Sequence, residues 1–274
     1  MKPLRVQDFL VSSEAFFLKH DPQTGALQTT PDLTQETLQK YYPKDTYLSY
    51  ADKANGLKET LYLWAKKTHI QTKLKRIAKV KRPGTLLDFG AGNGAFALAA
   101  QAKGWEVTTF DYSETAKKLL TKKGIPQINE IHQNHKFDVI TLWHVFEHLP
   151  YPKDHLLKFY ESLAPGGILV LALPNHKSWD ATHYGPYWAA YDVPRHLWHY
   201  SKESIYWLAK EADLSIIKTH NMFWDAFYIA LVSEQYKKSK YPWLLGFIKG
   251  LYSNVIGWSQ KNTSSLTFIL QKPK

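Results

Sequence analysis

The sequence predicts an α/β fold in which a mostly parallel sheet is covered by helices. From Thr85 onward, short runs rich in Val, Ile and Leu alternate with segments of helical pattern, which is typical of parallel strands joined by crossover helices. The runs do not alternate with polar residues, as expected for strands buried on both faces. The predicted strands are residues 85–89, 107–110, 137–143, 167–173, 214–219 and 266–271, with a weak further strand near 126–129.

Helical patterns fill the gaps between these strands. Ser113 and Ser201 stand where an N-cap residue accepts hydrogen bonds from the first turn, and Gly124 stands where a helix ends. The predicted helices are residues 95–103, 113–123, 153–163 and 202–212.

The region before the first strand has a different pattern. Residues 1–80 are predicted to form an N-terminal cap, with a polar stretch to about Asp45, an aromatic patch at 41–50 and a helix over 56–80. Residues 81–274 form the main domain in this prediction.

Two insertions interrupt the main domain. The first is a loop at 176–200, which lies at the carboxyl edge of the sheet, where substrates bind in open α/β folds. The second is an aromatic segment at 222–260, whose pattern predicts two amphipathic helices separated near Tyr241 and Pro242.

Composition and charge exclude several classes of function. The 274 residues, 44% of them apolar, suffice for a sizeable core, and no uncharged apolar run reaches the roughly 18 residues of a membrane span. Acidic residues soon after Lys2 and Arg5 interrupt any secretory pattern, so we expect a cytoplasmic protein. The absence of cysteine excludes disulfides, thiolate zinc sites and cysteine nucleophiles. The net charge of +11 favours an anionic partner.

A glycine-rich turn from Asp88 to Ala95 follows the first strand and opens a helix. Its glycines allow backbone amides to approach a ligand at the helix N-terminus. Asp111, at the end of the second strand, is placed to accept hydrogen bonds from both hydroxyls of a ribose. The turn also fits the dinucleotide pattern G-x-G-x-x-A, but a diphosphate would be repelled by Asp88. The turn therefore favours a cationic nucleotide cofactor.

Four successive segments resemble the motifs of class I S-adenosylmethionine-dependent methyltransferases. They are LLDFGAGNGAFALAA, VTTFDYS, FDVITLWHVFEHLPYP and LAPGGILVLALPN, and WAAYDVPRHLWHYSKESI with DAFYIALVSEQYK resembles an uncharacterised bacterial subgroup. The resemblance implies a Rossmann-like sheet of seven strands in the order 3-2-1-4-5-7-6, with helical cap elements. It also implies S-adenosylmethionine as the cofactor.

The resemblance assigns cofactor contacts residue by residue. Asp111 would hold the ribose, and Tyr112 would pack near the adenine. Trp143 and His144 would contact the methionine end. The methionine part would be lined by Asp88, Phe89, Gly90, Ala91, Gly92, Asn93 and Gly94.

The chain departs from its relatives at the start of the N-terminal cap. Relatives often carry a C-x-x-C-G element before a T-x-P stretch, and the equivalent here is residues 21–25, followed by Thr30 and Pro31. Without cysteine this element cannot bind zinc through thiolates. We expect a degenerate zinc-ribbon-like start that survives as a metal-free loop.

His144, Glu147 and His148 form the pattern H-x-x-E-H directly after a predicted strand. A zinc-peptidase helix carries the same pattern, but Pro150 and Pro152 cut any helix short. Ubiquinone-pathway O-methyltransferases carry E-x-x-E-H at the equivalent place as a magnesium site, which a histidine in place of the first acid disfavours. Three roles stay open: action on the substrate, structural hydrogen bonding, and metal binding. We favour the first, with His144 as general base, and expect no metal.

A second polar cluster lies in the 176–200 loop. Tyr191, Arg195, His196 and His199 are the predicted substrate-binding residues. Arg195 can clamp a carboxylate or phosphate, which suggests an anionic acceptor. The alternative is a salt bridge to Asp192 that fixes the loop.

Two surfaces suggest other partners. Eight basic residues from Lys66 to Arg82 accompany an apolar stripe, which indicates either a solvated helix face or a nucleic-acid surface. The aromatic insertion indicates a cap packed on the core, or a lipid-facing or homodimer surface with nearby lysines. Tyr42, Tyr47 and Tyr50 would close over the cofactor.

The sequence therefore predicts a methyltransferase that acts on a small-molecule acceptor at oxygen. RNA methylation is the second choice. A catalytically silent cofactor-binding protein and a nicotinamide oxidoreductase are further alternatives.

Overall fold

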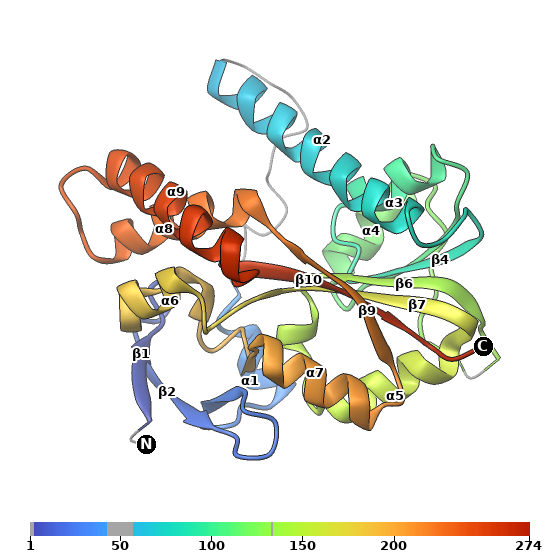
Figure 1. Cartoon of the computed structure of the whole chain (residues 1–274), viewed down its shortest axis with the longest axis horizontal. Helices are drawn as coiled ribbons and strands as arrows, with labels where there is room; N and C mark the ends of the chain where they lie inside the picture. Colours follow the sequence, from blue (N-terminus) through green and yellow to red (C-terminus); the bar gives the residue numbers. More distant parts are fainter. Residues whose placement is uncertain (1–2, 43–56, 133) are drawn as a thin grey trace. The chain divides into compact units, whose positions relative to one another are not determined.

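The computed structural model describes residues 3–42, 57–132 and 134–274. Within this part of the chain the main sheet has six strands, in the order β5-β4-β6-β7-β10-β9 (Figure 1). These strands are β4 (Thr85–Phe89), β5 (Glu106–Phe110), β6 (Phe137–Trp143), β7 (Leu163–Pro174), β9 (Ser215–Asn221) and β10 (Ser265–Gln271).

The pairing of the first strands is parallel, as predicted. β4 pairs in parallel with β5 and β6, so that Asp88 stands opposite Thr109 on one side and Thr141 on the other. The weak strand predicted near 126–129 is reduced to one isolated bridge between Thr109 and Gln127. Leu86, Leu87 and their neighbours in β6 and β7 are fully buried, which explains the unbroken apolar runs.

The helices of this sheet begin and end close to their predicted limits. Ser113 and Ser201 are N-caps as predicted, because their hydroxyls accept hydrogen bonds from the amides of Ala116 and Ser204. The helices are α2 (Leu57–Ala78), α3 (Ala95–Gln101), α4 (Glu114–Lys122), α5 (Pro152–Ser162) and α7 (Lys202–Glu211).

The N-terminal residues form a second sheet that the sequence analysis did not predict. The antiparallel strands β1 (Leu4–Gln7), β2 (Ala15–His20) and β3 (Leu27–Thr30) pair in that order, and β3 also pairs with β8 (Trp198–His199). The degenerate element at residues 21–25 is the turn between β2 and β3. Asp21 closes this turn by accepting hydrogen bonds from the Thr24 hydroxyl at 2.6 Å and the Gln23 amide at 3.1 Å.

Close contacts group the chain into two compact units. Unit 1 comprises residues 1–43, 143–157 and 171–270, and unit 2 comprises residues 44–142, 158–170 and 271–274. The grouping does not follow the boundary expected between residues 80 and 81, since the N-terminal sheet goes with the 176–200 loop. Unit 1 also contains the short helices α1 (Gln35–Gln39), α6 (Trp179–Tyr184), η2 (Gly185–Tyr187) and η3 (Ala189–Tyr191).

The basic helix α2 is amphipathic. Leu74 and Ile77 are buried, whereas Lys67, Lys75 and Lys79 are exposed. This arrangement agrees with the solvated helix face weighed in the sequence analysis. Tyr47 and Tyr50 lie outside the described residues.

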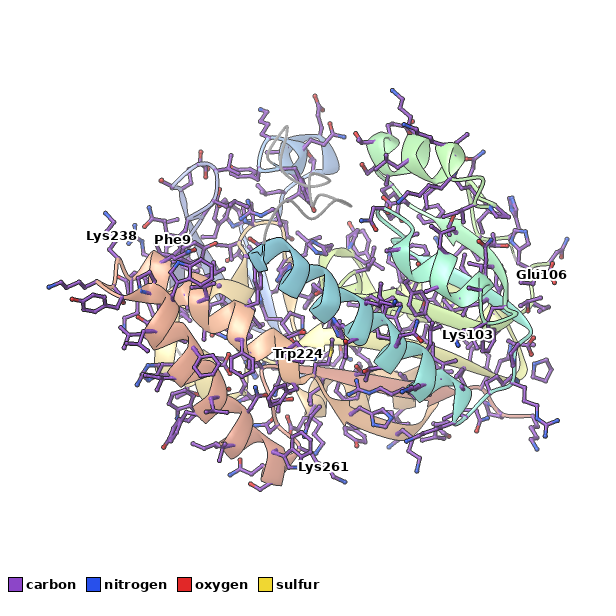
Figure 2. All side chains as sticks on the ribbon, turned by 90° about the horizontal axis from the view of Figure 1, so that it is seen from above. Phe9, Lys103, Glu106, Trp224, Lys238 and Lys261 are labelled. Atoms are coloured by element: carbon purple, nitrogen blue, oxygen red, sulfur yellow. The ribbon has the colours of Figure 1, made fainter. Side chains whose placement is uncertain are left out.

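The aromatic insertion forms two helices, α8 (Phe223–Tyr236) and α9 (Pro242–Gln260), as predicted. Gly246 and Gly250 allow close packing, because a Cβ at either position would lie 2.6 or 2.8 Å from the backbone of α8. Large side chains of α9 are nevertheless exposed, among them Trp243 and Trp258. Figure 2 labels Lys238, which follows α8, and Lys261, which ends α9. Among the described residues, no helix is both long and apolar enough to cross a membrane.

Candidate functional site

The glycine loop is shaped by the end of β5. Gly90, Gly92 and Gly94 have φ values of 77°, 55° and 73°, which glycine adopts without strain. The amides of Gly90 and Ala91 donate to the carbonyl of Phe110 at 2.7 and 3.2 Å. The amide of Gly92 donates to Asp111 at 2.8 Å. Because these donors are already engaged within the protein, the loop offers them to no diphosphate.

Asp88 is a buried carboxyl at the end of β4. It is 2% exposed, and its Oδ1 accepts a hydrogen bond from the Thr141 hydroxyl at 2.8 Å. Burial raises the pKa of Asp88 to about 7, despite the opposing effect of Thr141. The ionised form of Asp88 would therefore be favoured by a positively charged ligand.

Asp111 and Tyr112, the predicted ribose and adenine contacts, directly follow β5. Asp111 accepts from the amides of Gly92 and Ser113, both at 2.8 Å, and each carboxylate oxygen keeps a further lone pair. Tyr112 is 56% exposed and meets Phe110 edge to face. Phe89, a predicted cofactor contact, is instead a core residue that is 3% exposed and stacked on Phe110.

Asn93 also has a structural role in the loop. Its side-chain oxygen accepts from the amide of Ala95 at 3.1 Å, and its carbonyl accepts from Lys123 at 2.8 Å. The first of these bonds provides an acceptor for the first amide of α3, whose N-cap residue is Gly94.

His144 follows β6, of which the half-buried Trp143 is the last residue. The φ of His144 is 56°, which is unusual for a residue other than glycine. Its Nε2 lies 3.0 Å from Asp225, which the sequence analysis missed, and its Nδ1 lies 3.5 Å from Glu147. Burial lowers the pKa of His144, but the two carboxylates outweigh burial and raise it to about 9. The ring is therefore mostly protonated at neutral pH.

The H-x-x-E-H pattern does not form a zinc-peptidase helix. Phe146–His148 is a single 3-10 turn, η1, and His144 lies outside it. The two histidines consequently do not stand one turn apart on an α-helix, as that alternative requires.

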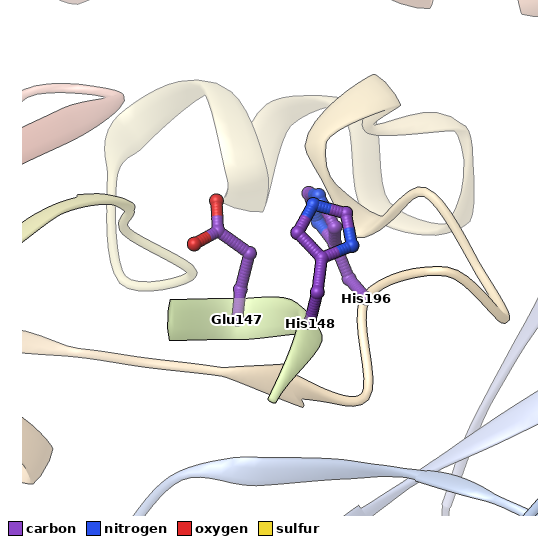
Figure 3. Close-up of side chains that lie close together, drawn as sticks. All are labelled: Glu147, His148 and His196. Carbon is purple, nitrogen blue, oxygen red and sulfur yellow. The ribbon is translucent and has the colours of Figure 1, made fainter. Parts of the chain in front are cut away.

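Glu147 and His148 instead meet His196, and Figure 3 shows the three side chains close together. His148 Nδ1 lies 2.9 Å from the carbonyl of Arg195, and the rings of His148 and His196 meet edge to face at 4.6 Å. Burial lowers the pKa of His148 to about 4. Burial raises the pKa of Glu147, but the surrounding histidines outweigh it and keep the pKa below its ordinary value. At neutral pH the carboxylate is therefore charged and the His148 ring neutral.

Arg195 is a buried structural residue and not an accessible clamp for substrate. It is 1% exposed. Its guanidinium bonds Asp192 at 2.7 Å, Asp8 at 2.9 Å and the carbonyl of Tyr41 at 2.8 Å. This arrangement agrees with the alternative in which a salt bridge fixes the loop.

Two other predicted substrate residues are buried beside this network. His199 is 4% exposed, and its Nε2 lies 3.0 Å from the hydroxyl of Thr29 in β3. Tyr191 is 5% exposed and packs edge to face on Trp188 and His199. Of the four residues predicted in this loop, only His196 joins the Glu147 cluster.

Several known proteins resemble this chain. In fold, it matches a putative sarcosine dimethylglycine methyltransferase from Galdieria sulphuraria with a TM-score of 0.52, at 17% identity over 76% of this chain and 86% of that one. It also matches phosphoethanolamine N-methyltransferase 2 of Haemonchus contortus, in complex with S-adenosyl-L-methionine, with a TM-score of 0.51 at 21% identity, over 76% and 53% of the two chains.

A curated relative matches in sequence. A ubiquinone biosynthesis O-methyltransferase from Idiomarina loihiensis is 29% identical in an alignment of 108 residues, which covers 34% of this chain and 44% of that protein. The family model described as a methyltransferase domain matches residues 63–219, more than half of the chain. The chain therefore belongs to the methyltransferase domain family and has the fold of the class I S-adenosylmethionine-dependent methyltransferases.

Proposed function

We propose that the chain transfers a methyl group from S-adenosylmethionine to an oxygen of a small-molecule acceptor, with His144 accepting the proton of the acceptor. The observation that carries the proposal is the placement of His144 after β6, with its ring held by Asp225 at 3.0 Å. A histidine oriented by a carboxylate is a common arrangement of a general base.

The glycine loop fits this cofactor. Asp88 suits the ammonium of its methionine part, whose chain Gly90–Gly94 would line, and a Cβ at Gly92 would meet no atom within 4 Å. Asp111 retains acceptor capacity for the ribose hydroxyls, and the exposed ring of Tyr112 offers a face for the adenine. When bound, the cofactor supplies a methyl group on a positively charged sulfur.

The surroundings of His144 fit a hydroxyl acceptor. Asp225 and Glu147 raise the pKa of His144 to about 9, so the ring can accept the proton of the acceptor only after it has lost its own proton to water. In the neutral form that results, the ring is a stronger base than an ordinary histidine. Its pKa lies close to the pKa of about 10 of a phenolic hydroxyl. A phenol-like hydroxyl is therefore the acceptor group that we favour, and the sequence match to an O-methyltransferase supports oxygen.

Methylation of cell fractions tests this function. The protein is incubated with S-adenosylmethionine that carries a labelled methyl group, in the presence of either a metabolite extract or total RNA. We expect the label in a small molecule, at oxygen by mass spectrometry. Label in RNA would favour an RNA methyltransferase, and cofactor binding without any labelling would favour a catalytically silent binding protein.

A substitution separates His144 from cofactor binding. Replacing His144 with Ala should lower turnover by about 10²–10⁴-fold, the usual contribution of a general base, while the affinity for S-adenosylmethionine stays close to that of the unsubstituted protein. His132→Ala, at an exposed histidine, is the matched control. Unchanged turnover in His144→Ala would remove His144 from the mechanism.

A further inference from the structure

We infer that Glu147, His148 and His196 form a binding site for a transition-metal dication of the Zn²⁺ type. One ligand atom from each side chain lies within 4.8 Å of the others (Figure 3). The set joins η1 to the 176–200 loop and does not include His144. The inference concerns binding alone, so it does not depend on the acceptor proposed above.

Hydrogen bonds orient both histidines for metal binding. His148 Nδ1 lies 2.9 Å from the carbonyl of Arg195, and His196 Nδ1 lies 2.9 Å from the carbonyl of Ala190. Because a carbonyl oxygen only accepts, each Nδ1 must carry the hydrogen. In the neutral rings the lone pair is then on Nε2. Metal-binding histidines usually have this arrangement, with the other ring nitrogen donating to a carbonyl or carboxylate.

Glu147 supplies a buried negative charge to the cluster. It is 1% exposed, and neither of its carboxylate oxygens has a hydrogen-bond partner among the described residues. The nearest ion-pair partner is His144 Nδ1, at 3.5 Å, which is too long for a good hydrogen bond. A charge buried in this way costs several kcal/mol unless it is paired. His144 supplies part of this pairing, and a dication bound at the Glu147 oxygens would add to it.

The backbone holds the two segments together. The amide of Leu197, next to His196, donates to the carbonyl of Glu147 at 2.9 Å. Arg195, on the other side of His196, is fixed by Asp8 and Asp192. The ligands are therefore largely in place before a metal binds. Ligands at about 2.0–2.2 Å from Zn²⁺ require side-chain movements on the order of 1 Å from the present separation.

The ligand types favour one class of metal. Two imidazoles and one carboxylate suit Zn²⁺ and related first-row dications, whereas Mg²⁺ prefers oxygen ligands and retains its water. Three protein ligands also leave a position open for water or another ligand. The hydroxyl of Tyr200 is buried without a hydrogen-bond partner among the described residues. Burial raises the pKa of Tyr200, and the charge of Glu147 raises it further.

Metal titration tests the site without cofactor or acceptor. The full chain is treated with a chelator and titrated with Zn²⁺ in a calorimeter, and in parallel with Mg²⁺. We expect one Zn²⁺ per chain and much weaker binding of Mg²⁺. His148→Gln and His196→Gln should each weaken Zn²⁺ binding by at least ~10–100-fold. Losing only the hydrogen-bond partner of a metal ligand already costs that much. His135→Gln should bind Zn²⁺ like the unsubstituted protein.

Two results would overturn the inference. One is the absence of stoichiometric Zn²⁺ binding by the folded protein. The other is unchanged affinity in both His148→Gln and His196→Gln, which would place the ion at surface histidines. If either variant does not fold, the spectrum of Co²⁺ bound to the unsubstituted protein decides, because nitrogen and oxygen ligands at an ordered site give visible ligand-field bands. A spectrum like that of hydrated Co²⁺ would contradict the site.

Discussion

The glycine loop and the loop around Arg195 are both polar, but they are assembled in different ways. Asp111 accepts amide hydrogen bonds from residues 19 and 2 positions away. Arg195 donates to Asp8 and to the carbonyl of Tyr41, which are 187 and 154 positions away. The first network arises from short stretches of sequence, and the second exists only after long-range folding. We therefore expect substitutions in the first to change cofactor binding and substitutions in the second to change stability.

Arg195→Met should have the largest effect. Methionine fills part of the volume but leaves the buried carboxylate of Asp8 and the partly buried one of Asp192 without their cation. Removing one partner of a buried ion pair costs about 3–5 kcal/mol. The free energy of unfolding, measured by urea titration, should fall by about this amount.

An exposed ion pair provides the control for Arg195. Lys117 and Glu114 lie 2.7 Å apart on the surface of α4, and such solvent-screened pairs contribute little to stability. Lys117→Met should therefore be nearly neutral. Similar losses in Lys117→Met and Arg195→Met would show that the Arg195 network does not stabilise the protein.

The contrast between local and long-range contacts also explains which parts of the fold could be predicted from the sequence. Strands β4 and β6 have the bounds that their apolar runs predicted, because both are buried on both faces and bounded by polar or turn residues. In β2, Phe16 and Leu18 are buried while Phe17 is 43% exposed. The apolar Phe17 hides the alternation that marks a strand with one buried face. β8 has only two residues, too few for any pattern.

The candidate sites also differ in how far they could be predicted from the sequence. The glycine loop could be predicted because its conformation depends on adjacent glycines and on the next strand. His196 joins Glu147 and His148 through backbone contacts between distant segments, which no local spacing reveals. Asp225 lies in the first turn of α8, where an acidic residue is ordinary. Its contact with His144 therefore gave no signal in the sequence.

Asp111→Asn should separate binding from stability in the glycine loop. The amide side chain can still accept from Gly92 with its one oxygen, but it loses the bond from the Ser113 amide, which is exposed and can bind water instead. It also loses the charge that strengthens hydrogen bonds from ribose hydroxyls. A hydrogen bond to a charged group contributes about 1.5–3 kcal/mol, so the dissociation constant for S-adenosylmethionine should rise about 10–100-fold in calorimetry. The free energy of unfolding should change little.

Glu114→Gln is the control for Asp111, since Glu114 is a nearby acid whose side chain is 76% exposed. It should bind the cofactor like the unsubstituted protein. A large loss of stability in Asp111→Asn, with cofactor affinity preserved, would reverse the contrast between the two loops.

Cofactor affinity should depend on pH through Asp88. The pKa of this carboxyl is about 7 without a ligand, so a proton occupies it increasingly as the pH falls below 7. A positively charged ligand prefers the ionised form and competes with that proton. The affinity should therefore fall as the pH decreases from 7 to 5.5, with a slope that approaches about tenfold per pH unit. The α-amino group of the cofactor stays protonated over this interval. Calorimetry at several pH values measures this slope.

Asp88→Asn removes the titrating group while preserving its shape. This variant should bind S-adenosylmethionine more weakly at pH 7, and its affinity should be nearly independent of pH over the same interval. An equally steep pH dependence in Asp88→Asn would assign the titration to another group.

The smallest expected effects come from two helix caps, one near each loop. Ser201 and Ser204 form a reciprocal capping box in which both residues are buried, whereas the exposed Ser113 accepts from Ala116 at 3.4 Å. Loss of a cap costs about 0.5–2 kcal/mol. Ser201→Ala should lie near the upper limit, because it leaves the buried backbone amide of Ser204 without its acceptor.

Ser113→Ala should lie near the lower limit, since water can replace the lost hydroxyl. Urea titration of the two variants compares them directly. Both caps are formed by residues close in sequence, so the difference between them depends on burial and on the reciprocal bond of the capping box. Equal losses of stability in the two variants would mean that burial of the 201–204 segment adds nothing to its cap. The sequence separation of the two partners, which is the same in both caps, would then be the better guide to their contribution to stability.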